Sequence, residues 1–235
     1  MKKILVLGIV LLAAACSSKK EGNMVVNGQI KGLKKGTLYL QKVENDSILK
    51  TIDSVAVMGS DQFTLTANVE EPEMYSLTFN GNTTNKYITF FAEPGTITIN
   101  DDVAKFGINP EIKGSKNQEI LNKYSKISRR FNNQNLDLIK LLFLAQKSNN
   151  KDSIELISKK QEQLLKRRYL VTVNFALNNK ENPVSPYIAL TELTNVRVKW
   201  LDTIYKSLTP TIKSSLYGKK LEKLVTDIKE AETKK

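Results

Sequence analysis

The spacing of apolar residues changes sharply at Gly114. Between residues 24 and 110, short runs of β-branched, leucine and aromatic residues are separated by turn residues, which is typical of antiparallel strands. After Ser115, a candidate helix N-cap, apolar residues recur at helical steps, as on one face of an amphipathic helix. We therefore predict an α+β protein, with an N-terminal antiparallel β-sandwich-like domain over residues 24–112 followed by a C-terminal all-α helical domain over residues 113–235.

The turn residues of the β half predict how neighbouring strands pair. The runs MVVNGQI (24–30) and TLYLQKV (37–43) flank a loop bounded by two glycines, which predicts a hairpin. The runs ILKTIDSVAV (48–57) and QFTLTANV (62–69) flank a Met-Gly-Ser-Asp turn and are predicted to pair in the same way. About seven or eight strands at this spacing predict a small β-sandwich or a rolled sheet.

Capping patterns predict where the later helices begin. Asp152 with Glu155 resembles a capping box ahead of a second amphipathic helix. Ser185-Pro186 and Thr209-Pro210 each place a capping oxygen before a proline, which suits the first helical position. The C-terminal half is therefore predicted to contain about four helices.

The N-terminus has the layout of a secretory signal peptide. Two lysines precede the apolar run Ile4–Leu12, and three alanines follow it, so residues 1–15 are predicted to be removed. The sequence LAAAC ending at Cys16 resembles a bacterial lipobox, which implies lipid attachment at that sulfur and N-acylation after cleavage. Residues 16–23 are then a polar, lipidated tether. The alternatives are an ordinary signal peptidase site or a buried cysteine.

The composition excludes several kinds of chemistry. Cys16 is the only cysteine and the chain has no histidine. After lipidation no free thiol remains for a disulfide, a thiolate metal site or nucleophilic catalysis, and no imidazole is available as a general base. Glu70-Glu71 and Asp101-Asp102 lack the ligand spacing of a calcium loop. We therefore predict a non-enzymatic protein without a cofactor or metal site, in which these acids are solvated in loops.

Charge differs between the two halves. Residues 24–110 hold 7 lysines and 10 acidic residues, whereas residues 111–235 hold 25 basic and 13 acidic residues. Doublets such as Arg129-Arg130 and Lys159-Lys160 could bind membrane phosphates or acidic glycans, although a solvated helix face is the simpler interpretation. Nucleic acid is a poor candidate partner because the chain is predicted to be exported and offers no aromatic stacking platform among its basic residues, so we expect no nucleic-acid partner.

Other candidate sites have plain structural explanations. Trp200 and Tyr205 could stack on a sugar, but a lone tryptophan in an amphipathic helix usually packs in the core. Aromatic residues in adjacent strands could line a groove or fill the core; they are Tyr75, Phe79, Tyr87, Phe90 and Phe91. Four Asp-Ser/Thr-apolar triplets look like an O-glycosylation sequon, although turn and cap chemistry also explains them. Their candidate acceptors are Ser47, Ser54, Ser153 and Thr203.

The whole layout resembles a family of Gram-negative envelope lipoproteins with a β-rich N-terminal domain of unknown function, a helical connector and a thioredoxin-like domain. The resemblance rests on structural patterns spread over nearly all of the chain after the tether. These are VVNGQIKGLKKGTLYLQK, ILKTIDSVAV with GSDQFTL, YITFFAEPGTITI, IKGSKNQEILNKY, NPVSPYIAL and SSLYGKKLEKLV. The family's Cys-x-x-Cys has no counterpart in this sequence, so only the lipid-attachment role of Cys16 is implied.

From these observations we expect a lipid-anchored, non-catalytic envelope lipoprotein that acts in binding or scaffolding. The expected location is the outer membrane, facing the periplasm, because Ser17 follows the cysteine and the tether lacks an acidic cluster. The expected partners are the membrane, through the lipid anchor, and an envelope protein or glycan. The alternative is an anchored partner subunit of a separate thioredoxin-like thiol-disulfide oxidoreductase.

Overall fold

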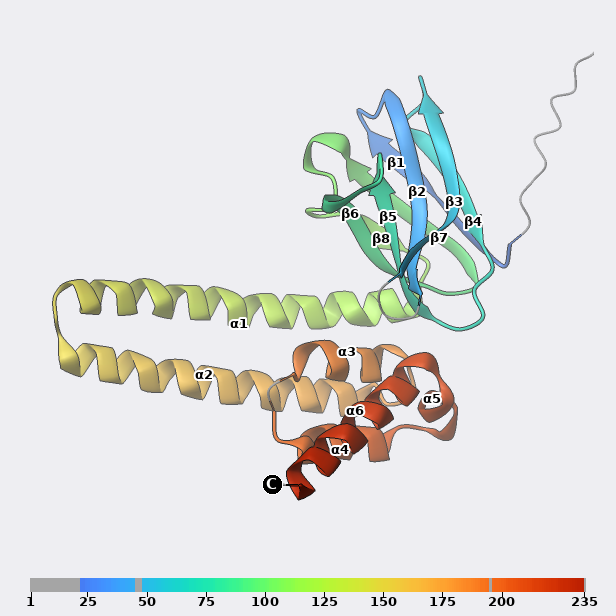
Figure 1. The fold of residues 1–235 in the computed structure, drawn as a ribbon. Helices are drawn as coiled ribbons and strands as arrows, with labels where there is room; N and C mark the ends of the chain where they lie inside the picture. The colour runs from blue at the N-terminus through green and yellow to red at the C-terminus, as the bar shows by residue number, and fades with distance from the viewer. Residues whose placement is uncertain (1–21, 45–47, 195, 235) are drawn as a thin grey trace, which may run out of the picture.

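The computed structural model describes residues 22–44, 48–194 and 196–234, and it confirms the predicted α+β class (Figure 1). In these ranges the N-terminal half contains two four-stranded sheets, with strand orders β4-β1-β7-β8 and β3-β2-β5-β6. The strands are β1 Met24–Lys31, β2 Lys35–Glu44, β3 Ile48–Met58, β4 Gln62–Ala67, β5 Glu73–Phe79, β6 Asn82–Ala92, β7 Gly95–Asp102 and β8 Glu111–Lys113. A short 3₁₀ helix, Val103–Lys105, follows β7.

Both predicted strand pairings are wrong. β1 pairs with β4 and β7, whereas β2 pairs with β3 and β5, so the first two strands lie in different sheets. β3 and β4 also belong to different sheets, although the Asp53 carboxylate accepts a hydrogen bond from the Thr66 N–H at 2.9 Å. The chain crosses between sheets after Gly32 and Gly59, where φ is +81° and +78°. β1 and β2, and likewise β3 and β4, therefore lie in opposite sheets on either side of the core, which covers the apolar side of both sheets.

The sandwich core is formed by the inward residues of both sheets. Val26 and Ile30 from β1 and Leu38 and Leu40 from β2 are fully buried, as their alternate spacing requires. Each such side chain contributes about 1.5–3 kcal/mol by leaving water. The core is therefore sufficient to hold the two sheets together without a disulfide.

Six helices follow in the described part of the C-terminal half. They are α1 Lys116–Lys147, α2 Lys151–Asn178, α3 Val184–Glu192, α4 Val198–Ser207, α5 Pro210–Ser214 and α6 Leu216–Thr233. The N-cap at Ser115 is confirmed, because its hydroxyl accepts a hydrogen bond from the Gln118 N–H at 3.1 Å. Thr209 occupies the N-cap position of α5, with Pro210 as the first helical residue, but its side chain makes no capping hydrogen bond.

Two predicted helix starts need correction. The cap of α2 is Asn150, not Asp152, because the Asn150 side chain accepts a hydrogen bond from the Ser153 N–H at 3.0 Å. Asn149, at φ +52°, reverses the chain just before it. Ser185 lies inside α3, where its buried hydroxyl donates to the Ala176 carbonyl at 2.8 Å and so ties α3 to α2.

The helices are unevenly covered by the rest of the molecule. α1 and α2 form a long antiparallel hairpin whose far end projects beyond the other elements (Figure 1). α3, α4, α5 and α6 pack around the C-terminal part of α2, where Val173, Ala176 and Leu201 share a buried cluster. No helix in the described residues is both long and apolar enough to cross a bilayer.

Candidate functional site

An aromatic cluster joins the sandwich to the helices. Phe90 and Phe91 are neighbours in β6, so they point to opposite faces of the sheet: Phe90 enters the sandwich core and Phe91 packs against the helical half. The Phe91 ring lies 5.2 Å from Tyr187 and 5.9 Å from Tyr217, between ring centroids and nearly edge-on. The two tyrosine rings are 5.1 Å apart. This apolar contact positions α3 and α6 against β6.

Hydrogen bonds fix the same junction. The Phe91 N–H donates to the Gln118 side-chain oxygen at 2.8 Å, and the Asn117 amide donates to Glu93 at 2.7 Å. Glu71 accepts a hydrogen bond from the Leu216 N–H at 2.7 Å, at the first turn of α6. A carboxylate is favourable there because helix N-termini carry partial positive charge. Glu71 therefore has a structural role that its interpretation as a solvated loop acid missed.

The other acidic pair holds a loop that borders a cavity. Asp101 accepts a hydrogen bond from the Gly107 N–H at 2.7 Å, and Asp102 caps the 3₁₀ helix through the Ala104 N–H at 2.8 Å. Gly107 adopts φ +85°, and a Cβ there would lie 2.3 Å from the Tyr87 carbonyl oxygen. Only glycine lets this loop approach β6 so closely.

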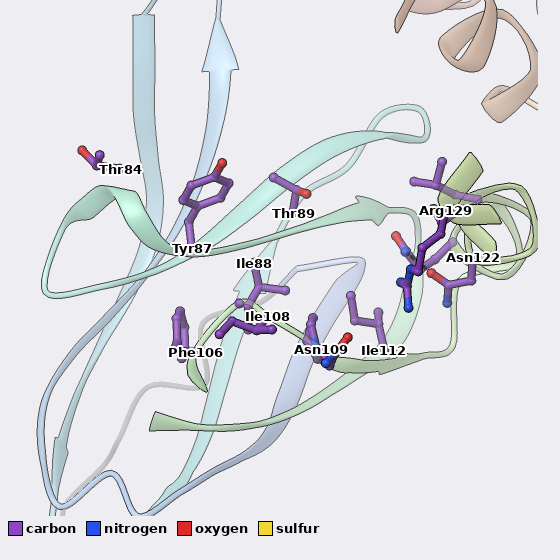
Figure 2. A pocket seen from close by; sticks show the side chains of 15 residues that line it. Thr84, Tyr87, Ile88, Thr89, Phe106, Ile108, Asn109, Ile112, Asn122 and Arg129 are labelled. Atoms are coloured by element: carbon purple, nitrogen blue, oxygen red, sulfur yellow. Dashed lines mark hydrogen bonds between the residues drawn. The ribbon is translucent and has the colours of Figure 1, made fainter. Parts of the chain in front are cut away.

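A groove opens where this loop, β6 and the first half of α1 meet (Figure 2). Its first lobe has a cavity volume of about 590 Å³ and is lined by Tyr87, Asn109 and Asn122, among others. A second lobe of about 370 Å³ lies toward α3 and includes Tyr187 and Thr191. We call the two lobes together the junction groove because they share lining residues. The shared residues are Thr89, Leu121, Ser125 and Arg129.

Arg129 gives the junction groove its charge. Arg129 is the basic residue that lines both lobes. The residue is exposed, and its guanidinium makes no hydrogen bond or ion pair with any residue that the structure describes. The remaining polar groups of the first lobe are amides and hydroxyls. In the second lobe Glu192 is neutralised by an ion pair with Arg168, at 2.7 Å. The groove thus presents one available cation among neutral hydrogen-bonding groups.

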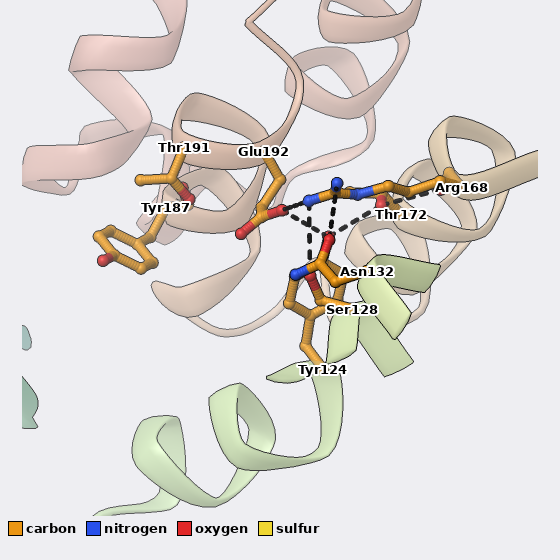
Figure 3. A network of polar contacts seen from close by, with 8 residues as sticks. All are labelled: Tyr124, Ser128, Asn132, Arg168, Thr172, Tyr187, Thr191 and Glu192. Carbon is orange, nitrogen blue, oxygen red and sulfur yellow. Dashed lines mark hydrogen bonds and ion pairs between the residues drawn. The ribbon is translucent and has the colours of Figure 1, made fainter. Parts of the chain in front are cut away.

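A network of polar contacts joins lining residues of the second lobe to α2 (Figure 3). Arg168 of α2 donates to Glu192 of α3 at 2.7 Å and to Asn132 of α1 at 3.2 Å, so it links three helices. The Tyr124 hydroxyl donates to Glu192 at 3.2 Å and is hydrogen-bonded to Thr172 at 2.9 Å. Burial raises the pKa of Tyr124 to about 12. The network therefore holds the α1 wall of the groove with a neutral phenol and a paired carboxylate.

The residues predicted as sites from the sequence lie elsewhere. Cys16 and Ser47 fall outside the described residues. Ser54 is exposed on β3, Ser153 is partly buried in the first turn of α2, and Thr203 is exposed on α4, with its hydroxyl donating to the Lys199 carbonyl at 2.7 Å. None of these three lines the junction groove.

Sequence reasoning found only part of the junction groove. Arg129 belongs to a basic doublet, and Tyr87 belongs to the aromatic strand set. Asn109 and Asn122 were missed because isolated amides on a loop and a helix carry no spacing signal. Trp200 packs against the helical cluster, in line with the core interpretation. Among the described residues, no group of three or more acidic or cysteine side chains is arranged to hold a metal ion.

Comparison with known families covers the sandwich and its junction with α1. Residues 24–121 match a family described as "Domain of unknown function (DUF4369)". The chain carries a DUF4369 domain. The match extends past the last strand into α1, so the DUF4369 domain includes Gln118 and Leu121, two lining residues of the groove.

The crystal structure of transthyretin from Sparus aurata is similar at a TM-score of 0.30 and 14% identity, covering 40% of this chain and 98% of that chain. No curated protein matches the sequence.

Proposed function

We propose that this protein is a lipid-anchored, non-catalytic protein of the Gram-negative cell envelope that binds an acidic glycan in the junction groove. The observation that carries the proposal is the position of Arg129, an exposed and unpaired cation in both lobes of a groove that is otherwise lined by neutral groups. A guanidinium pairs with carboxylate, sulfate or phosphate oxygens through two parallel hydrogen bonds. It would supply the charge recognition of an acidic sugar.

The other lining groups suit a sugar backbone. Asn109, Asn122 and Ser125 offer both donors and acceptors, which matches the hydroxyl groups of a carbohydrate. Tyr87 and Ile108 are 41% and 67% exposed at the first lobe and provide apolar surface for a sugar ring. The two lobes meet at the residues that they share, among them Ser125 and Arg129 of α1. Two connected lobes favour an extended ligand over a single small molecule.

The anchor and the location rest on the sequence. The apolar leader, the LAAAC sequence and the single cysteine support lipid attachment at Cys16, and Ser17 supports the outer membrane with the protein facing the periplasm. The absence of histidine from the sequence supports a binding role over a catalytic one. A ligand held close to the membrane by such a protein would be retained rather than converted.

A panel of acidic glycans bearing uronate, sulfate or phosphate groups, together with their neutral parent saccharides, tests the proposal by calorimetric titration. We expect at least one acidic member to bind and its neutral parent to bind more weakly. Arg129→Gln should weaken the acidic ligand by about 10-fold to 100-fold, the range for one charge-assisted contact. The matched control is Arg130→Gln, because Arg130 does not line the groove. Absence of binding across the panel, or an equal effect of the two substitutions, would contradict the proposal.

A second candidate is an anchored partner subunit of a separate thioredoxin-like thiol-disulfide oxidoreductase. The DUF4369 match over residues 24–121 supports it through the family layout described above. Crosslinking in intact envelopes followed by mass spectrometry separates the two candidates. Recovery of a Cys-x-x-Cys protein favours partnership, and recovery of glycan without such a protein favours the binding role.

A further inference from the structure

The far part of the α1–α2 hairpin exposes an unusual amount of apolar surface. α1 carries LDLIKLLFL over residues 136–144, so apolar side chains point in almost every direction around the helix. Leu138 and Leu142 point toward α2 and are partly covered, but their neighbours are not. Large apolar side chains of the hairpin that are about half exposed or more are the following: Leu136 54%, Ile139 46%, Leu141 50%, Phe143 64%, Leu144 58%, Leu156 55%, Leu165 46% and Leu170 49%.

The side chains beside the α1–α2 seam form two faces with different charge. We define the basic face by residues that recur at steps of four and three on both helices. They are Arg130, Gln134, Asp137, Leu141 and Leu144 on α1, and Leu156, Lys160, Gln163, Arg167 and Leu170 on α2. Arg167 donates to Gln134 at 2.9 Å, and a shallow groove lined by Asp137, Lys160 and Gln163 runs between them, so the two rows are adjacent.

The basic face combines cations with leucines. Arg130, Lys160 and Arg167 outnumber its single carboxylate, Asp137, which lies 3.8 Å from Lys140 outside the face. At either end of the paired rows, the exposed leucines stand beside these cations. Long basic side chains can bury their stems along apolar surface while the charged heads stay at a polar boundary. The basic face therefore offers cations for a negatively charged surface and leucines for an apolar layer beneath it.

Within the part of the chain that the structure describes, the opposite face of the hairpin has no unpaired cation, because the Arg168 guanidinium that borders its groove is paired with Glu192. We define this neutral face by Asn132, Asn135 and Ile139 on α1, and by Ser158, Glu162, Leu165 and Tyr169 on α2. Its groove is lined by Asn135, Glu162, Leu165 and the paired Arg168, among others. The neutral face exposes apolar side chains as the basic face does, so it separates the effect of charge from the effect of apolar exposure.

We propose that the basic face docks side-on against a bilayer that contains anionic phospholipid. The leucines enter the boundary between headgroups and acyl chains, and the cations pair with lipid phosphates. End-on insertion is disfavoured because the hairpin turn is polar, with Ser148, Asn149, Asn150 and Lys151 in sequence. A second copy of the same face is a poor occupant because the pairing would oppose two surfaces of like charge.

The reach of the chain is compatible with this contact. This step rests on the lipid anchor of the proposed function. Residues 16–23 can span no more than about 28 Å when extended. α1 has 32 residues and is therefore about 48 Å long. The anchor therefore keeps Met24 within about 28 Å of one bilayer, which raises the local concentration of the hairpin at that surface.

A fluorophore placed on each face tests the docking in the intact lipidated protein. Leu141→Cys and Ile139→Cys create matched labelling sites on the basic and neutral faces, since the two side chains are 50% and 46% exposed. Each variant is labelled with an environment-sensitive nitrobenzoxadiazole dye and reconstituted into phosphatidylcholine vesicles with or without phosphatidylglycerol. We expect a blue shift and brighter emission only at position 141 and only with phosphatidylglycerol.

Charge substitutions sharpen the test. The double substitution Lys160→Gln and Arg167→Gln should lower the equilibrium constant for docking about 30-fold. Each cation near an anionic surface contributes about 1 kcal/mol to binding, and the two substitutions remove two of them. The control is Lys159→Gln with Lys166→Gln, which removes the same charge from lysines paired with Glu155 and Glu162 off the face. This control should leave docking near the parental value, and circular dichroism checks that all variants keep their helix content.

Several outcomes would overturn the docking proposal. These are equal responses at the two labelled positions, a response without phosphatidylglycerol, and no response at all. A response at position 141 that grows with protein concentration and needs no vesicles would assign the face to a second copy instead. Failure of the lipid anchor is distinguished because the unsubstituted protein would then take up dye at a free Cys16.

Discussion

The backbone N–H of Met74, in β5, donates a hydrogen bond of 2.8 Å to the hydroxyl oxygen of Tyr217, in α6. The two residues are 143 positions apart in the sequence, so this contact joins the sandwich to the last helix. Tyr217 is 8% exposed, and its ring also packs against Phe91. The junction that forms the groove wall therefore depends on residues from both ends of the fold.

Removing this hydroxyl should destabilise the protein. Tyr217→Phe keeps the ring contacts but leaves the Met74 N–H without its acceptor, at a cost of about 1–3 kcal/mol in the free energy of unfolding. Urea denaturation measures the change. The control is Tyr205→Phe, because that hydroxyl bonds to Glu222 at an exposed site. We expect the control to change the free energy of unfolding by less than about 0.5 kcal/mol.

Stability should fall at alkaline pH because of buried phenols. Burial raises the pKa of Tyr124 from 10.0 to about 12 and also raises the pKa of Tyr187 and of Tyr217. Above pH 10.0, the ordinary pKa of tyrosine, the unfolded chain loses phenol protons that these buried tyrosines keep in the folded protein. The stabilisation is therefore complete below pH 10.0 and is lost as pH rises toward about 12. Urea midpoints across this range measure the slope, and Tyr124→Phe should make it shallower.

Gly107 should be more sensitive to substitution than another glycine of similar φ. Gly107→Ala places a Cβ 2.3 Å from the Tyr87 carbonyl oxygen, whereas Gly81, at φ +70°, has no atom within 4 Å of the added carbon. Gly81→Ala should cost about 1–2 kcal/mol for its backbone conformation alone. Gly107→Ala should cost more and should also weaken glycan binding, because the loop must move away from β6. If urea denaturation gave the same loss in the free energy of unfolding for both variants, the close approach of Gly107 to the Tyr87 carbonyl would not contribute to stability.

The Arg168–Glu192 pair should be energetically coupled. A double-mutant cycle with Arg168→Gln and Glu192→Gln isolates the pair, whose side chains are 29% and 26% exposed. We expect a coupling of about 1 kcal/mol or more, because partial burial and shared partners strengthen the contact. The reference is Lys166–Glu162, exposed at 70% and 64%, for which about 0.3–0.5 kcal/mol is expected. Couplings of the same size would contradict a supporting role for the network.

The sequence predicts elements better than it predicts their partners. Alternation located the strands, and helical spacing with Ser115 located α1, because both signals are local. The parallel pairing of β1 with β7 joins Met24 to Gly95, a relationship that no nearby residue encodes. Turn glycines at 32 and 59 are equally compatible with a hairpin and with a crossing between sheets. The strand partners were therefore predicted wrongly although the sandwich itself was confirmed.

The same limit applies to the sites. Tyr87, Asn109 and Asn122 come from a strand, a loop and a helix, so the groove exists only after folding. On the hairpin, the helical steps of apolar residues after Ser115 predicted one apolar face for α1, and the partly buried Leu138 and Leu142 lie on it. The exposed Leu141 and Leu144 show that the apolar face is wider than the α2 contact can cover.

Lipid attachment at Cys16 is the claim on which the envelope location and the reach of the hairpin both depend. Mass spectrometry of the N-terminal peptide, from protein purified out of native envelopes, tests it directly. We predict a mature chain that begins at Cys16 and carries a diacylglyceryl group on its sulfur and an acyl group on its α-amino nitrogen. A mature chain that begins at another residue, or an unmodified Cys16, would contradict the proposal.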